Sequence, residues 1–148
     1  MVEEDGSVIQ DHLFNPFGYS MNGVVAKDCY WTIHITPEAH CSYVSFESNV
    51  RLASYDDLIA KVVGTFRPSR FTAVVHANAF SPFARKFDGG LCKMVPANVV
   101  GYSITTHSMA SFGKRHAIQL ANYETRPCSE DDDCIWSSAS SANCSSIE

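Results

Sequence analysis

The sequence predicts an α+β protein in which an antiparallel β-sheet is covered by a helix. Residues 30–36 alternate between apolar and polar side chains, as in a half-buried strand, and residues 54–68 carry apolar side chains at helical spacing. Further alternating segments are separated by turn-forming residues. At 148 residues and 45% hydrophobic content, the chain can bury one core, so we expect a single folded body.

The first expected elements form a compact three-stranded meander. Residues 14–23 and 30–36 both have extended character. A short turn centred on Lys27 joins them into a hairpin. Side chains that face one another across a hairpin lie at equal distances from its turn, so Ser20 is expected opposite His34. Their Cβ atoms should then lie about 4.5–5.5 Å apart, close enough for hydroxyl and imidazole to interact.

The next elements follow from proline and capping signals. Pro37 ends the second strand because proline has no amide hydrogen for the ladder, and it places Glu38 on the following loop. Ser54 can cap a helix that stops before Pro68, with its apolar stripe facing the core. The remaining expected strands are residues 71–78, 91–95, 99–106 and 116–123, with an irregular segment at 79–90.

The net charge of −5 is concentrated at the C-terminal end. Residues 1–123 carry ten acidic and ten basic side chains, whereas residues 124–148 carry six acidic side chains and Arg126. We therefore expect a neutral folded body over 1–123 and a disordered acidic tail, rich in serine and cysteine, over 124–148. The neutral body shows no basic face in its sequence, which argues against nucleic acid as a partner.

The cysteines and the N-terminus indicate the compartment. Six cysteines occur without a C-x₂-C pair, so no metal site is expected. The first residues are acidic where a signal peptide would be basic, and no apolar run approaches membrane-spanning length. These features predict a cytoplasmic protein with free thiols and no membrane contact.

Four short sequence motifs within the meander carry a resemblance to one enzyme family. They are LFNP at 13–16, GYSMN at 18–22, TIHITPE at 32–38 and SYVSFE at 42–47. By these motifs and their spacing, the chain resembles the eukaryotic S-adenosylmethionine decarboxylases, pyruvoyl enzymes that make the aminopropyl donor for spermidine and spermine. The resemblance is strongest from about Val8 to Phe71 and covers only the C-terminal part of the family's length. It implies that the chain is part of a four-layer αββα sandwich.

The resemblance implies roles for five residues, each of which would otherwise pass for an ordinary core, strand or turn residue. Phe14 resembles the aromatic that stacks on the adenine of the substrate, and Glu38 the carboxylate that accepts hydrogen bonds from both ribose hydroxyls. Ser20 and His34 resemble the pair that assists self-processing, in which a Glu-Ser bond rearranges to an ester and β-elimination leaves the pyruvoyl group. Glu47 resembles an acid of the putrescine effector site, although a solvated strand glutamate is an equal alternative.

The resemblance also implies what the chain lacks. In the family, the serine that becomes the pyruvoyl group belongs to the N-terminal portion. Glu47-Ser48 is the one Glu-Ser pair here, and its surroundings match a family strand rather than a cleavage site. Phe17 stands where the family usually has cysteine.

We therefore expect part of a decarboxylase that binds S-adenosylmethionine and putrescine and is inactive without the N-terminal portion or a homologous subunit. A catalytically dead paralogue that regulates an active enzyme is the first alternative. An unrelated antiparallel binding module is the second. Joint retention of Phe14, Ser20, His34 and Glu38 favours the enzyme over the regulatory paralogue, and the motif match argues against the unrelated module.

Overall fold

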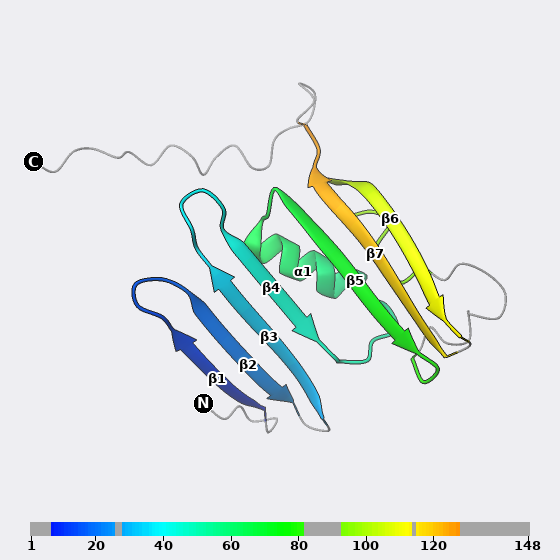
Figure 1. Ribbon diagram of the computed structural model, residues 1–148, viewed down its shortest axis with the longest axis horizontal. Coiled ribbons are helices and arrows are strands. Elements are labelled where there is room, and N and C mark those ends of the chain that lie inside the picture. The colour runs from blue at the N-terminus through cyan, green and yellow to red at the C-terminus, as the bar shows by residue number, and fades with distance from the viewer. Residues whose placement is uncertain (1–6, 26–27, 82–92, 114, 128–148) are drawn as a thin grey trace, which may run out of the picture.

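The computed structural model describes residues 7–25, 28–81, 93–113 and 115–127. Within them the chain forms a strand-rich layer with one helix (Figure 1). In chain order the elements are β1 (Val8–Leu13), β2 (Tyr19–Val25), β3 (Cys29–Thr36), β4 (Tyr43–Ser48), α1 (Asp56–Phe66), β5 (Arg70–Asn78), β6 (Tyr102–Phe112) and β7 (His116–Thr125).

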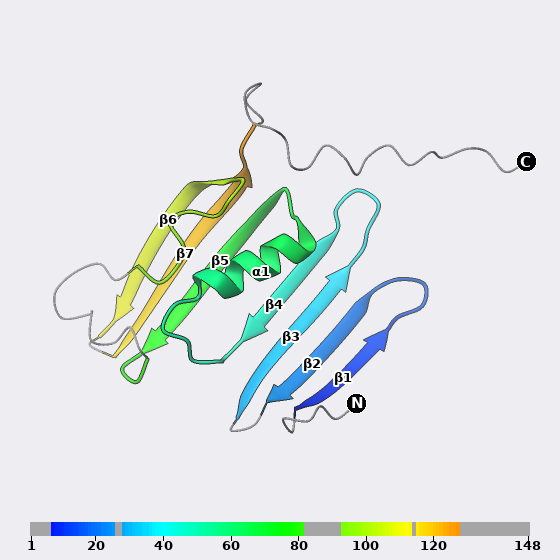
Figure 2. The ribbon, with the colours of Figure 1, turned by 180° about the vertical axis from the view of Figure 1, so that it is seen from behind.

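The strands form two antiparallel sheets. The first has the order β1-β2-β3-β4, and the second has the order β5-β7-β6. The sheets lie in one layer, with β4 and β5 side by side and pointing the same way (Figure 1). Helix α1 connects these two strands and lies across one face of the layer (Figure 2). Strands that run parallel need such a crossover connection, so α1 serves both as linker and as cover. The predicted antiparallel sheet with a helical cover is confirmed.

The core lies between α1, the segment 93–99 and the helix-facing side of β5 and β7. Alternate residues of β5 and β7 point into it, and Tyr123 is fully buried there. Four of the buried side chains in this core are alanines, whose small size allows the helix and the segment 93–99 to approach the sheet closely. The buried cluster consists of Val63, Ala73, Val75, Ala77, Met94, Val95, Val99, Ala117, Ala121 and Tyr123.

A buried polar side chain ties the segment 93–99 to the sheet. Gln119 is 2% exposed, and its Oε1 accepts hydrogen bonds from the backbone N–H groups of Met94 and Val95, the latter at 3.0 Å. Its Nε2 forms a hydrogen bond with Nε2 of His107. The Tyr123 hydroxyl donates to the carbonyl oxygen of Pro96. These bonds satisfy polar groups that would otherwise be costly to bury.

Helix α1 follows the sequence prediction closely. The Ser54 hydroxyl accepts a hydrogen bond from the backbone N–H of Asp56 at 3.1 Å, one residue before the cap position at Tyr55. The helix ends at Phe66 because Arg67 adopts a left-handed conformation and donates its N–H to the carbonyl oxygen of Val63. The predicted apolar stripe is the face that loses solvent contact: Leu58, Ile59, Val62, Val63 and Phe66.

The first predicted strand is wrong in its position. Residues 14–18 form a tight loop instead of a strand, with a cis peptide between Asn15 and Pro16 and a positive φ of 117° at Gly18. The extended chain resumes at Tyr19 as β2. A separate strand, β1, precedes the loop and pairs with β2, so the sheet has four strands rather than the expected three.

Three other boundaries also differ from the prediction. Residues 93–95 are not a strand, because the amides of Met94 and Val95 are held by Gln119; residues 91–92 lie outside the described part. The strand expected at 99–106 begins at Tyr102 and continues to Phe112, and β7 extends to Thr125. Of the expected irregular segment, residues 82–90 lie outside the described residues, as do residues 128–148 of the expected tail.

Candidate functional site

The hairpin of β2 and β3 brings Ser20 and His34 together. The register pairs Ser20 with His34, as the symmetry about Lys27 predicted. Oγ of Ser20 lies 2.9 Å from Nδ1 of His34, within hydrogen-bonding distance. If Nδ1 carries the hydrogen and donates to the serine, Nε2 keeps a free lone pair and the hydroxyl hydrogen can serve another acceptor. The pair can therefore offer a base and a hydroxyl donor at the same time.

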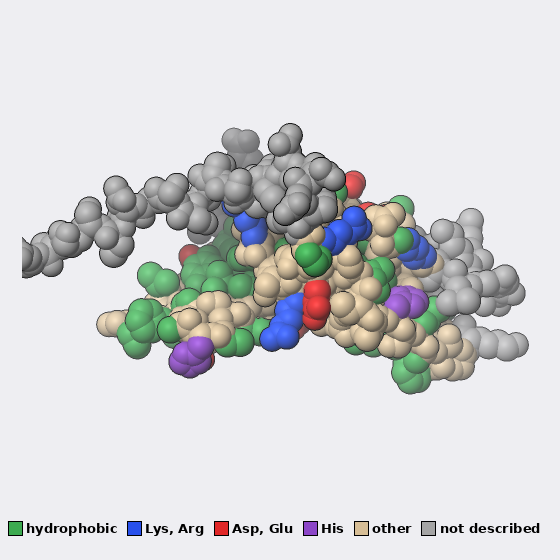
Figure 3. All heavy atoms as spheres, turned by 90° about the horizontal axis from the view of Figure 1, so that it is seen from above, with side chains coloured by type: hydrophobic (Ala, Val, Ile, Leu, Met, Phe, Trp, Pro, Cys, Tyr) green, Lys and Arg blue, Asp and Glu red, His purple; other side chains and the backbone are tan. Residues whose placement is uncertain are grey.

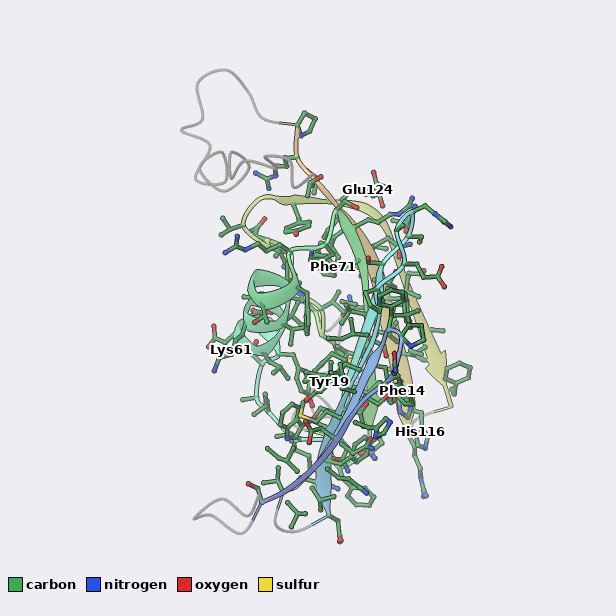
Figure 4. The ribbon with its side chains drawn as sticks, turned by 90° about the vertical axis from the view of Figure 1, so that its left-hand side faces the viewer. Phe14, Tyr19, Lys61, Phe71, His116 and Glu124 are labelled. Carbon is green, nitrogen blue, oxygen red and sulfur yellow. The ribbon has the colours of Figure 1, made fainter. Side chains whose placement is uncertain are left out.

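Both residues belong to a polar row that crosses the four strands β1 to β4. The register aligns His12 with Ser20, Ser20 with His34, and His34 with Ser45. Their neighbours along the strands, such as buried Met21 and half-buried Ile33, point to the other face. In Figure 4, Tyr19 lies on the helix side of the sheet, whereas Phe14 lies toward the opposite side. The row thus lies on the face without a helix among the described residues, which we call the open face.

Phe14 stands at the edge of this row. Its backbone N–H donates to the carbonyl oxygen of Gly18 at 2.9 Å, which closes the loop between β1 and β2. Gly18 is required there because its positive φ disfavours residues with a Cβ. The Phe14 side chain is 46% exposed and makes an edge-on contact with His12. The ring is therefore partly accessible to a planar ligand.

Glu38 lies on the loop after β3, at the same end of the sheet as the Phe14 loop. Strand β3 ends at Thr36, as Pro37 predicted. The Glu38 backbone accepts a hydrogen bond from the Ser42 hydroxyl at 3.2 Å and donates to the Thr36 carbonyl. Its carboxylate has no partner among the described residues, so both of its oxygens can accept hydrogen bonds from a ligand.

Glu47 lies on β4 opposite Thr32, in the next row of the open face, and it is exposed in this chain. Its neighbour Ser48 points to the other face. The Ser48 hydroxyl donates to the carbonyl oxygen of Tyr30 at 2.8 Å and accepts from the backbone N–H of Val50 at 3.2 Å. The Glu47-Ser48 bond thus lies in a regular, paired strand, which argues against a processing site.

Neither Phe17 nor the described cysteines add a further group to the candidate site. Phe17 is 74% exposed, so its ring does not have to fit into the core. Cys29 and Cys41 are free, and the other four cysteines lie outside the described residues. Where the structure is described, no group of three or more His, Cys, Asp or Glu residues is placed to hold a metal ion.

The surface carries no concentration of positive charge in the view from above. Lys and Arg side chains are scattered among neutral and acidic ones on this face (Figure 3). No helix in the described part of the chain has the length and apolar character needed to cross a bilayer.

His12 lies beside the candidate site and is not among the residues that the sequence predicts for it. It lies on β1, directly opposite Ser20 and in ring contact with Phe14. Alternation along β1 puts His12 on the open face, and the loop after Leu13 brings Phe14 against it, so the nearness of the two residues in the sequence was the available signal. Because the sequence pattern does not predict β1, it does not place His12 on this face.

Comparison with known proteins yields one consistent family. The family model described as adenosylmethionine decarboxylase matches residues 3–124. The S-adenosylmethionine decarboxylase proenzyme of Dictyostelium discoideum is 44% identical over 119 residues, which cover 80% of this chain and 30% of the relative. The Xenopus laevis proenzyme is 57% identical over 76 residues, which cover 51% of this chain and 23% of the relative.

A solved structure of the same family matches the fold. It is described as the Trypanosoma brucei AdoMetDC-delta26 monomer, with a TM-score of 0.72 and 30% sequence identity. The match covers 84% of this chain and 49% of that chain. The chain thus spans less than a third of the curated relatives named above and about half of the solved structure.

Proposed function

The chain belongs to the adenosylmethionine decarboxylase family, and we propose that it supplies part of the active site of an S-adenosylmethionine decarboxylase serving spermidine and spermine synthesis. The observation that carries this proposal is the Ser20–His34 hydrogen bond on the open face, with Phe14 and Glu38 at the same end of the sheet. The family's pyruvoyl group supplies the carbonyl that accepts electrons during decarboxylation. We place the serine that forms this group in a portion outside this chain.

Phe14 and Glu38 are proposed to recognise the nucleoside part of S-adenosylmethionine. Adenine presents a flat π-face that can stack on the partly exposed ring of Phe14. The ribose presents two vicinal hydroxyls, and the Glu38 carboxylate has both oxygens available to accept from them. Because Phe14 and Glu38 sit on loops at one end of the sheet, they can hold the nucleoside beside the Ser20–His34 pair.

Ser20 and His34 are proposed to assist the self-processing of the proenzyme. In the ester stage, a base must remove the α-proton of the esterified serine so that the carboxylate of the preceding segment can leave. Nε2 of His34 suits this step when Nδ1–H donates to Ser20. The Ser20 hydroxyl then fixes the imidazole and can itself donate to the oxyanion of the earlier N-to-O acyl shift.

Glu47 is proposed to be one carboxylate of a putrescine site. It lies in the row Gln10, Asn22, Thr32 and Glu47, which adjoins the Ser20–His34 row on the same face. A diamine binds where carboxylates approach both of its ammonium groups, and Glu47 supplies one. The remaining acids, together with cover for the open face, are proposed to come from the N-terminal portion of the enzyme or from a homologous subunit.

A chimera tests the proposed function. Residues 7–127 would replace the matching segment of the Dictyostelium proenzyme, of which this chain covers 30%. We expect the chimera to cleave itself and to release labelled carbon dioxide from carboxyl-labelled S-adenosylmethionine, with activity lost on borohydride reduction. The 148-residue chain alone should release none. A folded chimera that neither cleaves nor decarboxylates would contradict the proposal and favour the catalytically dead regulatory paralogue.

A further inference from the structure

We propose that His12 is a positioning residue that fixes the Phe14 ring in the orientation needed to bind a purine base. The inference rests on the proposed function of Phe14 and deepens it. His12 carries none of the roles that the family resemblance implies for this chain.

The contact between the two rings is specific in geometry. The centroids of His12 and Phe14 lie 4.5 Å apart, and their planes meet at 71°, a T-shaped arrangement. Aromatic pairs prefer this edge-to-face geometry because of their ring quadrupoles. A T-shaped contact covers at most one face of the Phe14 ring, so it can restrain the ring without itself blocking the other face, on which a base can stack.

The Phe14 ring gains from such support because it lies outside the core. It lies on a loop, is nearly half exposed and is not part of the buried core. Its backbone is held by the hydrogen bond to Gly18, and a Cβ on Gly18 would lie only 3.5–3.6 Å from the Phe14 side chain. Gly18 therefore fixes the backbone of Phe14, and the contact with His12 restrains its ring. A binding ring that is held before the ligand arrives loses less rotamer freedom on binding.

The register separates His12 from the chemistry of the pair. His12 faces Ser20 from β1, while His34 faces it from β3. The Ser20 hydroxyl is bonded to His34, not to His12. Removing the His12 ring should consequently disturb Phe14 and leave the Ser20–His34 bond in place.

The test compares four variants of the complete protein that contains this chain. They are His12→Ala, His12→Phe, Phe14→Ala and, as a matched control, His116→Ala, which removes another exposed ring that stacks on a neighbour. The measurements are KM for S-adenosylmethionine, inhibition by adenosine, kcat and the rate of self-cleavage.

We expect His12→Ala to raise KM and the adenosine inhibition constant roughly two- to tenfold, with kcat and self-cleavage unchanged. His12→Phe should restore binding, and His116→Ala should resemble the wild type. If Phe14→Ala weakens adenosine binding but His12→Ala does not, the positioning role is wrong. A parallel loss of kcat or self-cleavage in His12→Ala would also overturn it. If Phe14→Ala leaves adenosine binding unchanged, the proposed function of Phe14 itself fails.

Discussion

Substituting Gly23 with alanine should damage the hairpin that carries Ser20 and His34. Gly23 lies on β2 directly opposite Trp31 on β3, and the indole covers its Cα. A Cβ added there would overlap Nε1 of Trp31 and lie 2.6 Å from Cε2 and 2.9 Å from Cδ1. Because these atoms belong to a rigid ring, the whole indole has to move.

The magnitude follows from overpacking. Forcing extra volume into a packed contact costs about 1–3 kcal/mol of the free energy of unfolding. Gly64 provides the matched control, because it lies within α1 and a Cβ there meets nothing within 4 Å. Gly64→Ala should therefore stabilise the protein by about 0.5–1 kcal/mol through better helix propensity. The same chemical change thus has opposite signs at the two glycines.

Urea unfolding followed by circular dichroism measures both effects. We expect a lower urea midpoint for Gly23→Ala and a slightly higher one for Gly64→Ala. The slope of the free energy of unfolding against urea concentration should be similar in both variants. In the complete protein, Gly23→Ala should also slow self-cleavage, because the displaced indole shifts the strands that align Ser20 with His34. A Gly23→Ala variant as stable as the wild type, with an unchanged Trp31 environment, would refute the packing described for the hairpin.

Three further predictions concern stability and the tail. Gln119→Leu leaves two buried backbone N–H groups unpaired and should lower the free energy of unfolding by about 2–4 kcal/mol. The control Gln10→Leu, on the exposed edge strand, should change it little. Equal urea midpoints for the two variants would contradict this prediction. Burial, with a smaller contribution from the Asp56 charge, raises the pKa of Tyr123 above its ordinary value of 10.0. The folded state therefore favours the neutral phenol. This contribution to the free energy of unfolding is complete below pH 10.0 and is lost as the pH rises toward the folded-state pKa. Urea midpoints should fall over that pH range, and Tyr123→Phe should weaken the fall. Limited proteolysis should remove the acidic tail beyond residue 127 before it cuts the body, and a tail as protected as β3 would contradict the disordered tail expected from composition.

The parts of the fold that depend on local rules were predictable from the sequence. The Ser20–His34 pairing follows from counting residues on both sides of Lys27, and the helix follows from apolar spacing before Pro68. The roles of the site residues came from the family resemblance and stay predictions. Geometry alone identifies the pair but not its reaction.

The parts that depend on distant contacts were not predictable. Residues 93–95 look like a strand, yet Gln119, far along the chain, binds two of their amides and holds them in a loop. The apolar neighbours of the Phe14 loop favour a strand in the sequence, although Pro16 and Gly18 indicate a turn. Strand β1 was missed because it is an exposed edge strand with little apolar alternation, and with it the contact of His12 was missed.

Self-cleavage of two variants tests the central claim most directly, namely that the hairpin pair performs processing while the loop residues bind substrate. In the complete protein, His34→Ala should accumulate an uncleaved or ester-trapped precursor that hydroxylamine splits, because the base for elimination is missing. Glu38→Ala should cleave normally but bind S-adenosylmethionine poorly, because the acceptor for the ribose is gone. Cleavage of His34→Ala at the wild-type rate, with only nucleoside binding weakened, would contradict the assignment and leave His34 as a structural residue of β3.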